Sequence, residues 1–259
     1  MRITVLVENT ANNENFETEH GLSLYIETEN KKILFDMGQG DLFAKNADKL
    51  GIDLKCVDIA VLSHGHYDHG GGLSEFLSRN DKATVFVNKG AFLPYYNGKH
   101  KYIGLDGELE NHPRVTLVDD EYRISDELIL LSCNDKTRKV DFGCFGLSKR
   151  IGDEFLPDDF THEQYLLIND KGRNILISGC SHKGILNIAE WFSPYALVGG
   201  FHFSKIPLDD GRLLSAAREL DRYQTEFYTC HCTGEEQYEF MRRYMKRLNY
   251  IRCGDTVVI

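Results

Sequence analysis

Apolar residues alternate with polar ones, or form short runs, at several places in the first third of the chain, and this spacing predicts β-strands. Residues 57–63 form a nearly continuous apolar run, which is typical of a strand buried on both faces. Residues 41–50 and 72–79 fit short helices, the first of them capped by Asp41. The strands expected in this part are 3–9, 22–28, 31–36, 57–63 and 83–88.

The second half of the chain places helices between strands. Strands dominate overall, a pattern that favours two packed sheets with helices on their outer faces. We therefore expect an α/β protein, and because no linker is visible, a single domain over residues 1–259. The expected strands are 127–132, 163–169, 174–179, 195–201, 226–230 and 256–259, and the expected helices are 184–192, 210–222 and 235–248.

Residues 90–127 break this pattern. They hold turn formers and aromatic side chains, among them Phe92, Tyr95 and Tyr102, with weak periodicity. A long irregular segment in a compact domain is often a lid or a binding loop. The alternative is a surface excursion whose aromatic side chains simply pack.

Composition narrows the function classes. The 259 residues are 42% hydrophobic and 27% charged, as in ordinary globular proteins, which excludes a disordered chain or a fibre. The net charge of −10 disfavours non-specific nucleic-acid binding but leaves room for a local anion pocket. No apolar run approaches the roughly 20 residues of a membrane helix. The start of the chain lacks a signal-peptide layout, so we expect a cytoplasmic protein without membrane contact.

The seven cysteines are scattered, and a chain of this length can build a core without disulfides. We interpret Cys56, Cys133, Cys144 and Cys253 as buried reduced thiols. The other three, Cys180, Cys230 and Cys232, lie beside histidines.

The strand predicted at 57–63 leads into the segment Ser-His-Gly-His-Tyr-Asp-His-Gly-Gly-Gly. Imidazole and carboxylate groups are ligands that divalent transition metals prefer. His64 and His66 share one side of an extended chain and can hold one ion together. If the chain turns at the glycines, Asp68 and His69 can reach a second ion. The glycines would also let a ligand approach closely, and the start of the next helix would suit an anion.

Three more histidines stand where predicted strands end: His182 after 174–179, His202 after 195–201 and His231 after 226–230. In layered α/β folds this is the usual position of a site. One such histidine would be unremarkable, but three with the same placement indicate a shared site.

The segment 63–72 resembles the metal-binding motif of the metallo-β-lactamase fold superfamily, and Leu-Phe-Asp-Met-Gly-Gln-Gly at 34–40 resembles its early strand-turn. Further stretches resemble a narrower branch, the dihydropteroate-synthase-like metallohydrolases, which includes an archaeal enzyme acting on a dihydropterin and ribofuranosyl-aminobenzene phosphate. These stretches are 19–27, 162–168, 178–188, 199–203 and 230–234.

This resemblance implies an αββα sandwich with metal at one edge of the sheets. It also implies one or two divalent ions, with zinc favoured and manganese or iron as alternatives. The implied ligands are His64, His66, Asp68, His69 and His231, supported by Asp36, with His182 completing the first ion and His162 as its rival. Cys180 stands where many members have a bridging aspartate, so it is a further possible ligand.

We therefore expect a metal-dependent hydrolase or transferase acting on a small phosphorylated or pterin-like molecule through activated water. Asp68 could orient that water, and His202 and His20 are candidates for proton transfer or substrate contact. Lys183 could hold a phosphate. Cys230 and Cys232 flank His231 with period two, so both should point away from it as buried thiols.

Two other functions fit the same residues. The cluster could hold iron in a redox protein, or hold a metal in a non-catalytic sensor whose coordination positions are all filled by protein. Fold and metal site do not fix the substrate.

Overall fold

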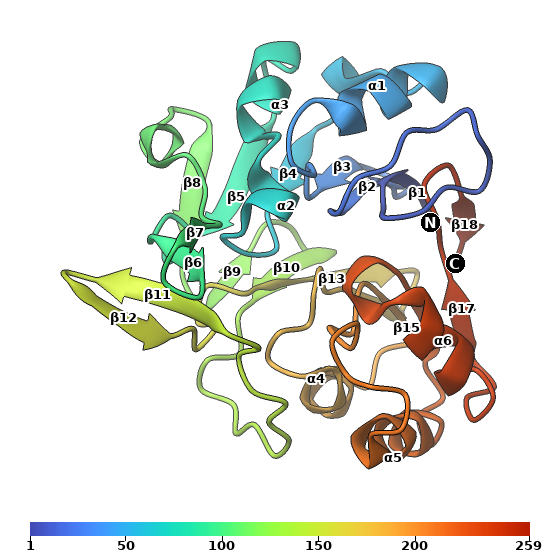
Figure 1. Cartoon of the computed structure of the whole chain (residues 1–259). Coiled ribbons are helices and arrows are strands. Elements are labelled where there is room, and N and C mark those ends of the chain that lie inside the picture. Colours follow the sequence, from blue (N-terminus) through green and yellow to red (C-terminus); the bar gives the residue numbers. More distant parts are fainter.

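The computed structural model describes residues 1–259 and consists mainly of two seven-stranded mixed sheets (Figure 1). In the first sheet β3, β4, β5 and β8 run parallel, and the remaining neighbours are antiparallel. Its strand order is β18 (Thr256–Val258), β1 (Arg2–Val7), β2 (Ser23–Glu27), β3 (Lys32–Phe35), β4 (Ile59–Val61), β5 (Thr84–Asn88) and β8 (Val115–Val118).

The second sheet has parallel strands at one end, β14 to β17, and antiparallel strands at the other. Parallel neighbours need crossover connections, and these contain the later helices of the chain. The strand order is β17 (Leu248–Tyr250), β16 (Glu226–Thr229), β15 (Ala196–Val198), β14 (Arg173–Ile177), β13 (Tyr165–Asp170), β10 (Leu128–Leu131) and β9 (Glu121–Arg123).

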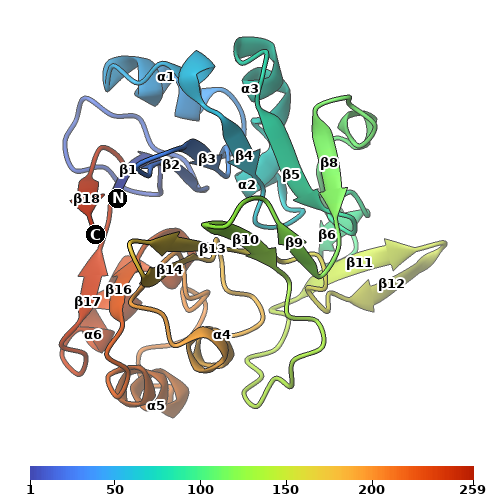
Figure 2. The ribbon, with the colours of Figure 1, turned by 180° about the vertical axis from the view of Figure 1, so that it is seen from behind.

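Helices cover the outer face of each sheet, with α1 and α3 on the first and α4, α5 and α6 on the second (Figures 1 and 2). One apolar cluster fills the space between the sheets, and one more lies under each helical layer. The expected αββα sandwich is confirmed. The helices are α1 (Leu42–Lys49), α2 (Tyr67–Gly70), α3 (Leu73–Arg79), α4 (Ile185–Phe192), α5 (Gly211–Leu220) and α6 (Glu235–Met241).

The structure differs from the expected elements in two places. Residues 90–127 are not irregular throughout, because β8 and β9 extend the two main sheets. In addition, β6 (Tyr95–Asn97) and β7 (Lys101–Tyr102) join the unpredicted hairpin of β11 (Leu147–Ile151) and β12 (Glu154–Pro157) in a small third sheet. These strands have two to five residues each and no regular alternation, so their pairing is decided by distant partners rather than by local pattern.

The helix expected over 235–248 ends at Met241, and the chain then pairs with β16 as β17. All seven cysteines are free, but Cys56 and Cys144 are only partly buried, which corrects the expectation that they lie in the interior. None of the helices has the length and apolar character required to cross a membrane.

Candidate metal centre

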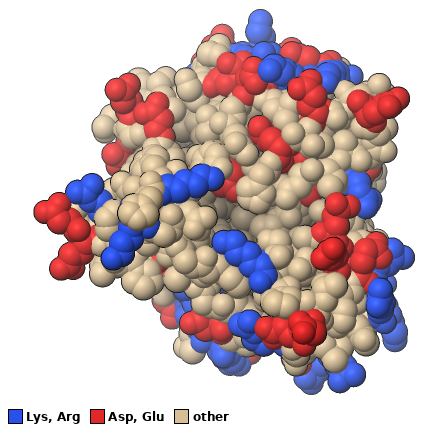
Figure 3. Space-filling view, viewed as in Figure 1, with Lys and Arg blue, Asp and Glu red and all other residues tan.

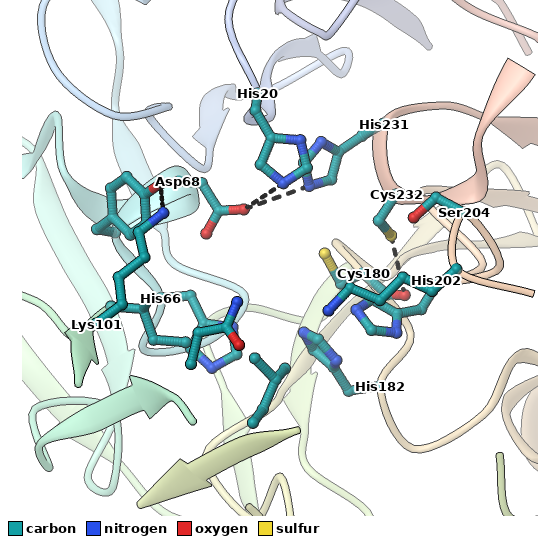
Figure 4. Close-up of a pocket in the computed structure, with 15 residues that line it drawn as sticks. His20, His66, Asp68, Lys101, Cys180, His182, His202, Ser204, His231 and Cys232 are labelled. Atoms are coloured by element: carbon teal, nitrogen blue, oxygen red, sulfur yellow. Dashed lines mark hydrogen bonds and ion pairs between the residues drawn. The ribbon is translucent and has the colours of Figure 1, made fainter. Parts of the chain in front are cut away.

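Most of the predicted site residues meet at one edge of the sandwich, where strands of both sheets end, and Figure 4 shows those that line the cavity there. The chain leaves β4 into residues 63–69 and leaves β14 into 179–183. It leaves β15 into 199–203 and β16 into 230–233. Together they line a cavity of about 160 Å³.

The turn after β4 is built differently from the expectation. It begins at Tyr67, the start of α2, so the chain bends before the glycines, and the ring of His69 comes to lie 4.2 Å from the ring of His64. A side chain on Gly71 or Gly72 would lie 2.3 Å from a carbonyl oxygen of Gln39 or Met37. The absence of a side chain at these glycines therefore leaves room for neighbouring backbone of the protein rather than for a ligand.

The first donor set consists of His64, His66 and His182, whose ligand nitrogens all lie within 4.8 Å of one another. The Nε2 atoms of His64 and His66 and both ring nitrogens of His182 are buried without a hydrogen-bond partner. A buried polar atom is rarely left unpaired, and an ion between the three rings would bind the Nε2 atoms of His64 and His66 and one nitrogen of His182. This is the clearest sign that the residues fit a metal.

His162, the rival for this role, has both nitrogens engaged. Its Nδ1 accepts the backbone N–H of Gly65 at 2.9 Å, so Nε2 carries the proton and donates to Asp158 at 3.2 Å. The structure therefore brings His182, and not His162, to the free nitrogens of His64 and His66. The carboxylate of Asp158 also lies 3.4 Å from His66 Nε2, and its position was not foreseen from the sequence.

The second donor set contains Asp68, His69, His231 and Cys180. His69 Nε2 lies 3.2 Å from His231 Nε2 and 3.1 Å from Cys180 Sγ. Asp68 Oδ2 lies 3.6 Å from His231 Nε2 and 3.9 Å from His69 Nε2. Zinc bonds of about 2.0–2.3 Å place neighbouring ligands of a tetrahedral ion roughly 3.3–3.8 Å apart, and the four distances, from 3.1 to 3.9 Å, lie close to this range.

Asp36 sets the proton positions on both sets. It accepts the Nδ1–H of His69 at 2.7 Å and the hydroxyl of Ser63 at 2.7 Å. Because Ser63 gives its proton to Asp36, its oxygen accepts from His64 Nδ1 at 2.8 Å. Both histidines thus present an unprotonated Nε2, the form that binds metal.

His231 is oriented in the same way by Asn9, whose side-chain oxygen accepts the His231 Nδ1–H at 2.8 Å. Its Nε2 therefore faces the lone pair of His69 Nε2 at 3.2 Å. Two lone pairs at this distance repel each other, so a proton or a metal ion must lie between them. Sequence reasoning missed Asn9, which follows β1 without any motif of its own.

Two buried glutamates hold the histidine-bearing turns. Glu8 accepts the backbone N–H of His231 at 2.6 Å, and Glu163 accepts that of His182 at 2.6 Å. His231 has φ = 50°, in the left-handed region. The carboxylates thus satisfy amide groups that such turns leave without a partner.

Burial controls the charges of the site. It lowers the pKa of His64 and His182 well below the ordinary value, an effect that the neighbouring histidines reinforce. Burial raises the pKa of Asp68, but His69 and His231 outweigh it, so the net pKa is lowered. His64 and His182 are therefore neutral and Asp68 is ionised at neutral pH, as metal ligands must be, whereas the contact with Asp68 raises the pKa of His231 despite its burial.

The remaining predicted residues are divided between the cavity and the interior. His20 and His202 line the cavity, and His20 Nε2 lies 3.5 Å from Asp68 Oδ2. Lys183 does not line it: its buried ammonium donates to the carbonyls of Ser132 and Glu163. That placement argues against the expected phosphate contact.

The two cysteines beside His231 do not behave alike. Cys230 lies in the apolar cluster between the sheets, as expected. Cys232 instead lines the cavity beside Cys180, which corrects the expectation that it points away. Residues 231–233 form a 3-10 turn, so the period-two argument, which holds for a strand, does not apply.

Comparison with known proteins agrees with this architecture. The family model of the metallo-beta-lactamase superfamily matches residues 17–192. The chain belongs to the metallo-beta-lactamase superfamily. The resemblance seen in the sequence is thereby confirmed.

Relatives and solved structures within the superfamily cover almost the whole chain. An uncharacterised protein of Methanocaldococcus jannaschii is 34% identical over 248 residues, 90% of either chain. The 7,8-dihydropterin-6-methyl-4-(β-D-ribofuranosyl)-aminobenzene-5′-phosphate synthase of that organism is 28% identical, covering 99% of this chain and 96% of its own. A crystal structure of a metal-dependent hydrolase of the beta-lactamase superfamily is 32% identical, with a TM-score of 0.85, covering 100% of this chain and 99% of that one.

Proposed function

We propose that this protein is a metal-dependent hydrolase that binds one or two divalent ions, zinc first among them, and cleaves a small anionic molecule. The observation that carries the proposal is the pair of donor sets beside one cavity, with unpaired nitrogens on His64, His66 and His182 and ligand nitrogens within 4.8 Å of one another. The similarity to a solved metal-dependent hydrolase supports it.

A divalent ion supplies Lewis acidity and lowers the pKa of a water molecule from 15.7 to ~7. The chain's own groups then position the water. Asp68 uses Oδ2 for its contacts with His20, His69 and His231. Its other oxygen, Oδ1, is left to accept a hydrogen bond from the water molecule. Burial lowers the pKa of His202 to about 3. This side chain therefore meets substrate as a neutral hydrogen-bonding group.

The substrate class follows from the charges around the cavity. Lys101 and Lys205 line it, although the protein as a whole carries a net charge of −10. Basic side chains lie beside the hollow in the space-filling view (Figure 3). An ammonium group attracts phosphate as a point charge. We therefore infer a phosphorylated substrate, and the aminobenzene-phosphate named for the archaeal relative makes pterin-like phosphates the first compounds to test.

The test begins with protein stripped of metal and reloaded with zinc, manganese or iron(II). Each form is assayed with a phosphodiester, a lactone, a thioester and a pterin-like phosphate. We expect metal-dependent turnover of the phosphorylated substrates. His66→Ala should abolish it, whereas His100→Ala, an exposed histidine outside the cavity, should not.

Inorganic phosphate provides a second arm. It should inhibit competitively, and Lys101→Ala and Lys205→Ala should each raise its inhibition constant and the KM while changing kcat less. Turnover that survives His66→Ala and metal removal would contradict the proposal. Iron-dependent redox activity without hydrolysis would favour the redox function instead.

A further inference from the structure

Two thiols from different strand ends meet beside the second donor set. Cys180 follows β14 and Cys232 follows β16, and both side chains line the cavity (Figure 4). Both are almost fully buried, with 3% and 4% of their surface exposed. Their sulfur atoms and a ring nitrogen of His231 all lie within 4.8 Å of one another.

The surroundings of Cys232 are those of a ligand rather than of a packing residue. It belongs to none of the apolar clusters, whereas Cys230, two residues earlier, packs between the sheets. A side chain on Gly200 would come within 2.3 Å of Cys232 Sγ, so this glycine leaves room for the thiol. Cys232 Sγ also donates to the carbonyl of Cys180 at 3.5 Å, which keeps the two segments together.

We propose that Cys232 is a ligand of the second ion and that Cys180, Cys232 and His231 form a thiolate-rich face of its site. This inference rests on the metal centre of the proposed function. Two cysteines and one histidine are a known three-residue set for catalytic zinc, and thiolates select zinc and iron over manganese. Asp68 Oδ2 lies 3.6 Å from His231 Nε2, next to this face.

Cobalt(II) tests the proposal, because thiolate-to-cobalt charge transfer gives a near-ultraviolet absorption that grows with the number of bound thiolates. The full-length protein is loaded with cobalt alone. Cys232→Ser and Cys180→Ser should each reduce the absorption per bound ion to about half. Cys230→Ser, a buried cysteine outside the cavity, should leave it unchanged. An unchanged band in Cys232→Ser would overturn the proposal.

A second measurement on the unaltered protein covers the case in which Cys232→Ser fails to fold. Mass spectrometry after alkylation should find Cys232 protected in zinc-loaded protein and modified once a chelator removes the zinc. Equal modification in both forms would overturn the proposal. If Cys232 fails these tests while one ion still binds and His66→Ala abolishes that binding, only this inference fails. If no metal binds at all, the proposed function fails with it.

Discussion

Replacing Asp36 by Asn should weaken both metal sites, because one carboxylate fixes the proton positions of a ligand in each. Asp36 accepts from His69 directly and from His64 through Ser63, with each of its own hydrogen bonds at 2.7 Å. It has φ = 58°, a region that Asn tolerates, so the backbone should be preserved. The side-chain N–H of the new Asn would face hydrogen-bond donors that the carboxylate accepted from, so these hydrogen bonds would be lost.

Loss of such a supporting group typically costs 10- to 100-fold in metal affinity, or about 1.4–2.7 kcal/mol. We expect a loss of this size for both ions, measured as two zinc dissociation constants by competition with a chromogenic chelator. Ser63→Ala should weaken mainly the first ion, because it interrupts only the path to His64. This difference between the two variants would show that Asp36 acts on the first ion through Ser63 and on the second ion directly.

A matched control is Asp58→Asn. Asp58 accepts the backbone N–H of Lys32 at 2.9 Å and pairs with Lys82 on the surface, so the same change is made away from the site. Denaturant unfolding of the metal-free proteins separates lost stability from lost affinity. If Asp36→Asn binds both ions as tightly as Asp58→Asn does, the assigned role of Asp36 is refuted.

Three further predictions concern other buried groups. The His182→Ala variant should lose the first ion while remaining folded, whereas the His162→Gln variant should keep that ion. Equal zinc content in the two variants would contradict the choice of His182 as the ligand. Burial lowers the pKa of His162 from 6.5 to about 4, so the unfolded chain gains a proton first as the pH falls. His162 alone should therefore account for up to about 3 kcal/mol of unfolding free energy lost by the metal-free protein between pH 6.5 and 4, and His162→Gln should remove that part of the profile in pH-dependent denaturation. Lys183→Met should cost about 1–3 kcal/mol of stability, because two buried carbonyls lose their hydrogen-bond donor. The zinc content of this variant should be unchanged. Loss of zinc without loss of stability would argue that Lys183 has a role in the site.

Local patterns were enough to predict most of the sandwich. The apolar run at 57–63 contains β4, and the regular alternation of later segments matches β13, β14 and α4 within a few residues. The hairpin β11–β12 was missed because only two of its residues are buried and its register depends on β6, about 50 residues earlier. No local pattern records such a partner.

The candidate site also contains residues that the sequence alone predicts and residues that only the fold reveals. His64, His66, Asp68 and His69 stand together in the sequence, and the strand-end rule found His182 and His231. Groups that act through a hydrogen bond to a ligand carry no such signal. Asn9 and Asp158 become visible only when the fold places them beside His231 and His66. Cys232 was misjudged because a 3-10 turn replaced the assumed extended chain.

The central claim is that two donor sets hold metal at one edge of the sandwich. A crystal structure of zinc-soaked protein, with anomalous data collected at the zinc edge, tests it most directly. We predict one peak about 2.0–2.1 Å from ring nitrogens of His64, His66 and His182, and a second peak bounded by Asp68 and His231. Absence of the first peak, or zinc found only elsewhere on the molecule, would contradict the account.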